Sequence, residues 1–558
     1  MAGLGFAFPL PIETCHGANT TAKWFRNAEE IRSAPTTPRL ACLVLIHSLE
    51  RVSSQPENPF AKLIPDQSIA IVPSFTLESG VTLRNVPVAY KTYGALSPEA
   101  DNAMVICHAL TGSADVGDWW GPLLGGPGKA FDISRFYVVC INSLGSPYGS
   151  ASPVTNIDGD PAKGHYGPEF PLTTIRDDVN IFKILLDELG VRQIATVIGG
   201  SMGGMLILEF AYFGKEYVRS IIPIATSARY SAWGISWGEA QRQSIYSDPK
   251  YEDGYYTFSD PPSTGLSAAR MSALLTYRSR NSFEARFGRN IPDPSRRQNI
   301  NGSDRPSTPS NEHFAIHNDG HRNVGSPRPS RKNSASSLPQ TPITSVPAPF
   351  QTIMDPQFHG TTPLSTSPTN STPPTTAMSP TQKRTPTYFS AQSYLRYQGQ
   401  KFISRFDANC YIAITRKLDT HDVSRNRLIP SSSSLDDPLQ DALSLITQPT
   451  LILGIESDGL FTFAEQQELH AGIPNSRLEK IDSSEGHDAF LLEFRQVNEL
   501  VTRWLGEVLP DLMGRAPRRE WDGSGGEGLV GGTEVDGEGR VVKGSMAGEA
   551  EVEDITAW

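Results

Sequence analysis

Between about residues 64 and 228 the sequence alternates short runs rich in β-branched residues with polar-faced stretches, and this alternation constrains the fold most strongly. The runs with the composition of strands are residues 81–94, 103–110, 136–145, 194–200 and 220–228. Residues 174–190 predict an amphipathic helix, because their apolar side chains recur at helical spacing from Ile175 to Leu186. Strands that alternate with helices form a mostly parallel sheet covered on both faces. The sequence therefore predicts an α/β fold.

Three stretches depart from this pattern. Residues 289–390 are dominated by Ser, Thr, Pro and Asn, so they cannot bury enough apolar surface to offset their conformational entropy. We interpret them as a disordered insertion, which is either a bare spacer or a platform for phosphorylation at Ser-Pro and Thr-Pro sites. The Gly-rich, acidic residues 512–558 predict an unstructured tail. Residues 1–58 lack periodicity and predict a poorly ordered extension, with a transit peptide as the alternative.

Composition narrows the class of function. The 49 Lys and Arg against 60 Asp and Glu give a net charge of −11, which argues against binding to nucleic acid or to an anionic membrane. The five cysteines are scattered without a CxxC pair, so neither a disulfide framework nor a metal site is expected. The apolar run at residues 41–47 is far shorter than the ~20 residues of a spanning helix. We expect a soluble, cytoplasmic protein without a membrane segment.

A glycine-rich turn provides the first candidate for chemistry. Gly199 to Gly203 enclose Ser201 in the pattern G-x-S-x-G, in which a sharp turn between a strand and a helix exposes a serine hydroxyl. The run before the turn is β-branched, and residues 205–214 after it are compatible with a helix whose N-terminus points at the serine. Such a helix aims backbone N–H groups at an oxyanion. We interpret Ser201 as a nucleophile; the alternative is that the glycines only allow close packing.

A serine nucleophile needs a base and an orienting carboxylate, which follow in the chain order Ser, Asp or Glu, His. Asp458 follows a predicted strand directly, and His487 lies in a loop before a predicted helix. The rival histidines, His421 and His470, have no strand before them. Glu456 lies nearer the strand, where its side chain would be committed to a sheet face. Asp458 and His487 are therefore the predicted partners of the serine.

An oxyanion hole combines the N–H after the nucleophile with a second N–H from the loop after an early strand. Here these donors would be the backbone N–H groups of Met202 and Leu110. His108 lies in the same loop, and we expect it to brace the loop rather than to act in catalysis.

Several long motifs, in this order, resemble the homoserine O-acetyltransferases of the α/β-hydrolase superfamily, in their fungal form. They are CHALTGSADVGDWWGPLLGGPGKAFD, GGSMGGM, RFGR, SYLRYQGQKFISRFDAN, ESDGLF and EGHDAFLLE. The resemblance covers about residues 59–509 and implies an α/β-hydrolase fold with a helical cap that the insertion interrupts. The implied segments are a core at 59–230 and 441–511, and a cap at 231–288 and 391–440.

The family transfers acetyl from acetyl-CoA to the hydroxyl of L-homoserine, on the way to methionine. The resemblance places its triad on the three residues chosen above and its substrate-binding arginine on Arg270. It places a second substrate contact on Asp488, and Tyr277 shares the face of Arg270. A guanidinium suits the α-carboxylate of homoserine, and a carboxylate suits its α-ammonium. The resemblance implies acetyl-CoA as a co-substrate, no bound cofactor, and a homodimer, which is common in the family.

Three other functions stay open at this stage. Relatives use L-serine or deacetylcephalosporin C as acceptor, or succinyl-CoA as donor, so a serine O-acetyltransferase or another O-acyltransferase is the near alternative. A plain esterase is the second. The third is a non-catalytic scaffold whose phosphorylatable insertion carries the function.

Overall fold

The computed structural model describes residues 48–291, 313, 317, 389–427 and 438–518. With the exception of Ser48, these residues belong to one compact unit, Leu49–Trp558. Residues 1–47 of the predicted extension, most of the predicted insertion and residues 519–558 of the predicted tail lie outside the described residues, so those expectations stay predictions.

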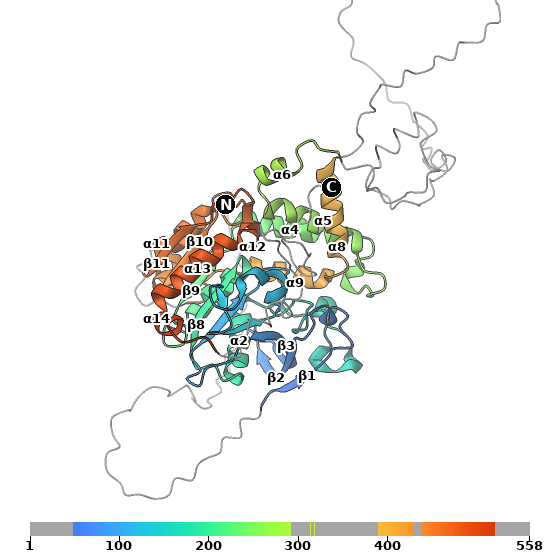
Figure 1. Cartoon of the computed structure of the whole chain (residues 1–558). Coiled ribbons are helices and arrows are strands. Elements are labelled where there is room, and N and C mark those ends of the chain that lie inside the picture. The colour runs from blue at the N-terminus through green and yellow to red at the C-terminus, as the bar shows by residue number, and fades with distance from the viewer. Residues whose placement is uncertain (1–47, 292–312, 314–316, 318–388, 428–437, 519–558) are drawn as a thin grey trace, which may run out of the picture. The chain divides into compact units, whose positions relative to one another are not determined.

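A mixed sheet organises the described residues (Figure 1). Its strand order is β1-β2-β3-β7-β4-β8-β9-β10-β11. The strands are β1 (Glu50–Val52), β2 (Ser68–Thr76), β3 (Thr82–Tyr93), β7 (Tyr137–Ile141), β4 (Ala103–Cys107), β8 (Ile194–Gly200), β9 (Ile221–Ile224), β10 (Thr450–Gly454) and β11 (Ser476–Lys480). The first three pair antiparallel, as do β3 and β7, whereas the pairs from β7 to β11 are parallel. Each run that the sequence predicted to be a strand contains one.

The ordered unit is slightly larger than the sequence predicted. β1 pairs with β2 inside the segment expected to be a poorly ordered extension, so order begins before residue 59. At the other end, α14 (Pro510–Met513) extends past the predicted start of the tail at residue 512. Elements of three or four residues are too short to leave a periodic pattern in a sequence. A two-stranded sheet of β5 (Leu124–Gly125) and β6 (Phe131–Asp132) is missed for the same reason.

Alternate residues of the central strands feed two cores, one on each face of the sheet. In β4, Ala103, Val105 and Cys107 belong to one core, and Met104 and Ile106 belong to the other. The first core also contains buried residues of α2 (Ile175–Glu188), α3 (Met202–Ala211), α10 (Pro438–Ser444) and α11 (Phe463–Gly472). The second contains those of α1 (Val116–Trp119), α12 (Ala489–Leu492), α13 (Phe494–Val508) and α14. Burial on both faces explains why the strands read as continuous apolar runs.

The predicted amphipathic helix is α2, and its N-terminus is capped by its own sequence. Thr174 Oγ1 accepts a hydrogen bond from Asp177 N at 3.1 Å, and Thr174 N donates to Asp177 Oδ2 at 2.9 Å. This reciprocal capping satisfies backbone donors that have no partner within the helix.

A second group of helices forms a cap connected to the sheet. It contains α4 (Ala232–Tyr246), α5 (Ser263–Tyr277), α6 (Arg280–Arg286), α8 (Ser390–Phe402) and α9 (Ala408–Asp419). α5 packs against α4 and α8, and these three lie side by side in Figure 1, while α4 also packs against α9. These helices lie within or next to the cap segments 231–288 and 391–440 that the resemblance implied.

A fully buried ion pair joins the cap to the core. Lys417 of α9 places its Nζ 2.5 Å from Asp178 Oδ2 of α2, and both side chains are 0% exposed. The same Nζ donates to the carbonyl oxygen of Leu144 at 2.7 Å, and Asp178 Oδ1 accepts from Leu144 N at 2.9 Å. Both charges therefore have additional partners, which a buried pair requires to offset the loss of hydration.

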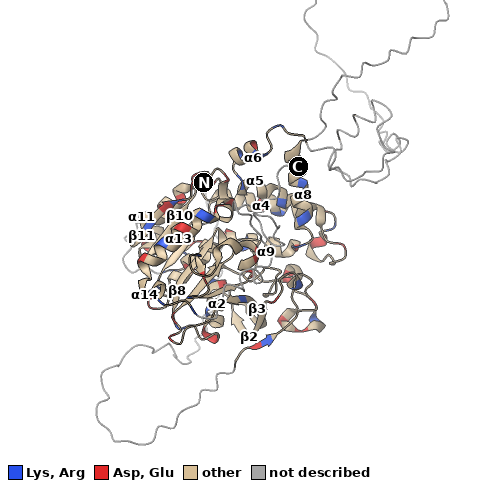
Figure 2. Ribbon diagram, in the orientation of Figure 1, with Lys and Arg blue, Asp and Glu red and all other residues tan. Residues whose placement is uncertain are grey.

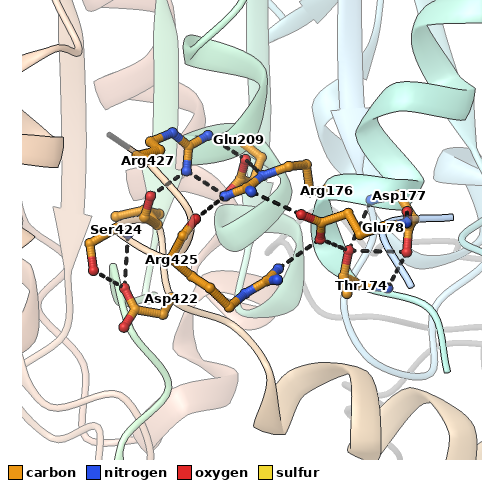
Figure 3. Close-up of polar contacts among 10 residues, drawn as sticks. Glu78, Thr174, Arg176, Asp177, Glu209, Asp422, Ser424, Arg425 and Arg427 are labelled. Atoms are coloured by element: carbon orange, nitrogen blue, oxygen red, sulfur yellow. Dashed lines mark hydrogen bonds and ion pairs between the residues drawn. The ribbon is translucent and has the colours of Figure 1, made fainter. Parts of the chain in front are cut away.

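A second ionic cluster lies where the chain leaves the cap, after α9 (Figure 3). Glu209 of α3 pairs with Arg176 of α2 at 3.1 Å and with Arg427 at 2.7 Å. Glu78, between β2 and β3, pairs with Arg176 at 2.9 Å and with Arg425 at 2.7 Å. We call these five residues the return network, because they tie the segment after α9 to α2 and α3.

Three further observations bear on function class. Among the described residues, no helix is long and apolar enough to cross a membrane. Within those same ranges, no group of three or more His, Cys, Asp and Glu side chains is arranged to hold a metal ion. Cys107, Cys140 and Cys410 are buried free thiols. Figure 2 shows Lys and Arg interspersed with Asp and Glu along the described elements.

Candidate active site

Four of the predicted site residues follow the carboxyl ends of parallel strands. Leu110 follows β4, Ser201 follows β8, Asp458 follows β10 and His487 follows β11. From β4 the chain passes to β7 on one side and later to β8 on the other, so β4 and β8 flank a topological switch point. Open α/β sheets bind ligands at such points. The pairing of Cys107 with Gly199 places the ends of these two strands next to each other.

Ser201 occupies a backbone conformation that few residues other than glycine adopt. Its φ is 60° and its ψ is −125°. Hydrogen bonds hold it there: Ser201 N donates to Ile224 O at 3.0 Å, and Ser201 O accepts from Thr226 Oγ1 at 2.8 Å and Gly204 N at 2.9 Å. Such strain persists only where the surroundings impose it, and it concentrates at functional sites.

The glycines around Ser201 are needed for close packing. A Cβ on Gly199 or Gly203 would lie 2.4 or 2.2 Å from the carbonyl oxygen of Cys107. A Cβ on Gly200 would lie 2.5 Å from the ring of Phe490, and one on Gly204 would lie 2.5 Å from the side chain of Thr226. Both interpretations of the turn therefore describe part of it: the glycines pack closely, and Ser201 is strained.

Asp458 and His487 form a buried pair. His487 Nδ1 lies 2.7 Å from Asp458 Oδ2, and the two residues are 3% and 4% exposed. The other carboxylate oxygen, Oδ1, accepts hydrogen bonds from Leu460 N at 2.8 Å and Phe461 N at 2.9 Å. These three contacts fix the carboxylate, which in turn fixes the imidazole with Nε2 directed away from Asp458. This is the arrangement that keeps a catalytic histidine in one tautomer.

Aromatic rings surround the imidazole. The ring centroid of His487 lies 5.3 Å from Phe461, 5.4 Å from Phe490 and 6.2 Å from Tyr277. Ser201, His487 and Leu110 line one small cavity of about 30 Å³ together with the cap side chains of α4, α5 and α9. The cap therefore forms part of the wall of the cavity that contains the predicted nucleophile.

The loop of the predicted oxyanion hole is held by His108. Its Nδ1 contacts Ala109 O at 2.8 Å, and its Nε2 accepts from Ser143 N at 3.0 Å, which assigns the neutral Nδ1–H tautomer. Burial, together with the charge of the nearby Lys417, lowers the pKa of His108 to about 4. The residue thus braces the loop as predicted. Met202, the first residue of α3, has an N–H without a partner inside the helix.

The substrate-binding candidates come from α5 and from the histidine loop. Arg270 is 1% exposed, and its guanidinium lies 5.5 Å from the ring of Tyr277 and 4.9 Å from that of Phe402. Tyr277 lines the cavity beside Ser201 and His487. Asp488 is also 1% exposed and forms an ion pair with Arg278 at 2.8 Å. Sequence reasoning missed Arg278, because its only signal is a partner more than two hundred residues away.

The rival residues lie elsewhere. His421 is buried, with Nε2 3.1 Å from the carbonyl oxygen of Ser227. His470 is exposed, with Nδ1 2.9 Å from Ser476 Oγ. Glu456 is exposed and pairs with Lys480 at 3.2 Å. None of the three lines the cavity that contains Ser201.

Comparison with known proteins agrees with this geometry. A model of the α/β hydrolase fold matches residues 102–318. The crystal structure of a homoserine O-acetyltransferase from Bacillus anthracis superposes with a TM-score of 0.55 and 18% identity, covering 81% of this chain and 98% of the other. This likeness establishes the α/β-hydrolase fold.

Sequence relatives are more specific. The homoserine O-acetyltransferase of Emericella nidulans is 66% identical over 510 residues, which are 91% of this chain and 98% of the relative. That of Ascobolus immersus is 57% identical over 538 residues, covering 91% of this chain and 97% of the relative. Identity at this level over nearly the whole of each relative extends through both the core and the cap. The chain belongs to the homoserine O-acetyltransferase family.

Proposed function

We propose that the protein is a homoserine O-acetyltransferase, which transfers the acetyl group of acetyl-CoA to the hydroxyl of L-homoserine on the way to methionine. The observation that carries the proposal is the Asp458–His487 pair at 2.7 Å, whose histidine lines one small cavity with the strained Ser201. The names of the relatives support the choice of donor and acceptor.

In the first step Ser201 becomes acetylated. His487 Nε2 takes the proton of Ser201 Oγ, and Oγ forms a bond to the thioester carbonyl carbon. The N–H groups of Leu110 and Met202 stabilise the oxyanion. The C–S bond then breaks, the CoA thiol leaves with the proton from His487, and an acetyl-serine remains. Asp458 keeps the imidazole in the required tautomer and stabilises its charged form.

In the second step homoserine removes the acetyl group. Its hydroxyl gives its proton to His487 and attacks the acetyl carbon, and Ser201 Oγ takes the proton back when its bond to that carbon breaks. Arg270 binds the α-carboxylate, for which a guanidinium is the best-matched partner. Asp488 pairs with the α-ammonium. A carboxylate accepts several hydrogen bonds at once, so its ion pair with Arg278 is compatible with this role.

Positioning of the acceptor beside Ser201 explains how acyl transfer outruns hydrolysis. An acceptor held beside the acetyl-serine reacts as if its effective concentration were on the order of 10⁵ M. Side chains of the cap line the cavity beside Ser201, where such an acceptor would bind. A plain esterase would release CoA at a rate that amino acids do not change.

A steady-state assay with two donors and two acceptors tests the proposal. Acetyl-CoA or succinyl-CoA is combined with L-homoserine or L-serine, and free CoA and the O-acyl product are both measured. The proposal predicts that acetyl-CoA with homoserine has the highest kcat/KM. Preference for serine or for the succinyl donor would favour the related O-acyltransferases, and CoA release independent of any acceptor would favour an esterase.

Replacing Arg270 tests how the acceptor is bound. Arg270→Ala should lower kcat/KM for homoserine by roughly 10- to 100-fold, because a charge-assisted pair with the α-carboxylate is lost. The matched acceptor is aminopropanol, which is homoserine without its carboxylate. Its weak use should be unchanged by the substitution. Equal losses with both acceptors would show that Arg270 does not bind the carboxylate.

Two further properties belong to the proposal. We infer a cytoplasmic location, because the free buried thiols of Cys107, Cys140 and Cys410 suit a reducing compartment. We also infer a homodimer, as the family resemblance implies.

A chain that lacks residues 291–390 should keep its activity if the insertion is a spacer, and a scaffold function would instead be lost with it.

A further inference from the structure

Arg278 directly follows α5, the helix that carries Arg270 and Tyr277. Its side chain is 3% exposed and lies between the two carboxylates that flank His487. Nη1 donates to Glu485 Oε2 at 2.6 Å, and Nε forms an ion pair with Asp488 Oδ2 at 2.8 Å. The buried guanidinium of Arg278 therefore contacts a carboxylate before and a carboxylate after the predicted catalytic histidine.

The Glu485 carboxylate also binds two residues of α6. Its Oε2 accepts a hydrogen bond from Ser282 Oγ at 2.6 Å and pairs with Arg286 Nη2 at 2.8 Å, both from α6. Burial raises the pKa of Glu485, but hydrogen bonds from these two residues outweigh it and lower the pKa below its ordinary value. Burial lowers the pKa of Arg278, and the charges of Asp488 and Glu485 outweigh it. The charged forms of Glu485 and Arg278 are thus stabilised.

Backbone contacts in the same place are tight. Gly486 has a φ of +78°, and a Cβ there would lie 2.4 Å from Ser279 N. Ser279 N donates to Glu485 O at 3.4 Å, and Ser279 Oγ donates to Ser484 O. The end of α5 and the histidine loop therefore cannot shift relative to each other without breaking these contacts.

His487 has separate anchors. Its Nδ1 contacts Asp458, and the N–H of the preceding Gly486 donates to Ser457 Oγ at 3.0 Å. Both anchors lie on the loop after β10, which is part of the core. Asp488, in contrast, is paired with a residue at the end of a cap helix. The geometry thus separates the support of the histidine from the support of the neighbouring carboxylate.

We propose that Arg278 is a positioning residue for the acceptor: it orients the Asp488 carboxylate toward the ammonium of homoserine and fixes the position of that carboxylate relative to α5. This inference rests on the proposed function. It makes Arg278 important when the acetyl group is transferred to the acceptor, and not when Ser201 is acetylated. Lysine cannot replace it, because a single ammonium on a flexible stem does not reproduce the planar fork that reaches two carboxylates.

The test measures the two half-reactions separately in the full chain. With acetyl-CoA alone, the Arg278→Lys and Arg278→Gln variants should give a CoA burst of wild-type amplitude and rate. With homoserine added, KM should rise by roughly 10- to 100-fold, the effect expected for a misoriented charged hydrogen-bond partner. The matched control is Arg280→Gln, whose side chain is 84% exposed and which should leave both half-reactions unchanged.

A double-variant cycle shows whether Arg278 acts through Asp488. In an Asp488→Asn background, Arg278→Lys should cause no further loss toward homoserine. Equal loss of burst and acceptor step, additive losses in the double variant, or an unchanged KM would each overturn the inference. If Arg278→Gln does not fold, the Lys variant decides, since it keeps a positive charge between the carboxylates. If homoserine does not speed CoA release in the wild type, the proposed function fails instead.

Discussion

At the residue scale, the turn around Ser201 combines two requirements that act on different residues. Gly199, Gly200, Gly203 and Gly204 have ordinary backbone angles and lack a side chain because neighbouring atoms occupy the space. Ser201 alone has a positive φ within the turn, and hydrogen bonds to its backbone N–H and carbonyl oxygen hold it there. The packing of the glycines brings α3 against β4, so it places Met202 and the loop of Leu110 on the same side of the serine.

Substitution of Gly203 tests the packing requirement. Gly203→Ala places a Cβ 2.2 Å from the carbonyl oxygen of Cys107, a backbone atom, so we expect a loss of about 2–3 kcal/mol in the free energy of unfolding. Urea-induced unfolding measures it. The matched control is Gly506→Ala in α13, where no atom lies within 4 Å of the added Cβ and helix propensity predicts a gain of about 1 kcal/mol. Similar values for both variants would contradict the account.

At the element scale, two of the ionic contacts that attach the cap to the core use helices that also carry or support the site. α9 is joined to α2 by Lys417 and Asp178, next to the loop that His108 braces. The return network joins the segment after α9 to α3, whose N-terminus lies at Ser201. The orientation of the cap over the cavity is therefore coupled to the elements beneath it.

Glu209 is the most buried member of the return network, and its removal should be costly. Glu209→Ala leaves Arg427 without its carboxylate in a site where Glu209 is 5% exposed, so we expect a loss of about 3–5 kcal/mol in the free energy of unfolding. The control is Glu499→Ala in α13, whose exposed pair with Arg495 at 4.0 Å should contribute less than about 1 kcal/mol. A loss below about 1 kcal/mol at Glu209 would show that the network is not a significant anchor.

At the scale of the whole molecule, hydrophobic periodicity predicted the sheet, and the order of motifs along the chain predicted the order of the site residues. Both signals come from short stretches of sequence. β8, α3 and the positions of Asp458 and His487 follow from runs of fewer than twenty residues. The pairing of Arg278 with Asp488 and the return network join segments far apart in the chain, and no local pattern records them. The burial of Arg270 also depends on distant segments. The sequence of its helix, α5, is compatible with an exposed arginine, and the packing of α8 against α5 buries it.

Buried histidines make the stability of the fold dependent on pH. Burial lowers the pKa of His108 and His421 from 6.5 to about 4. Between these values the unfolded chain takes up a proton at each histidine and the folded chain does not, so stability falls as pH falls through this window. Each site contributes a loss of up to about 3 kcal/mol by pH 4. His421→Gln should reduce the slope of the unfolding free energy against pH by the amount that corresponds to about one bound proton. An unchanged slope would contradict this.

The central claim is that Ser201 carries the acetyl group between the two substrates. The most direct measurement is rapid mixing of the enzyme with acetyl-CoA in the absence of an acceptor, followed by mass spectrometry of the intact chain and of the peptide that contains Ser201. The account predicts one acetyl group per chain on Ser201, its rapid loss when homoserine is added, and neither acetylation nor a CoA burst in Ser201→Ala. A CoA burst that persists in Ser201→Ala, or an acetyl group on another residue that homoserine removes, would contradict it.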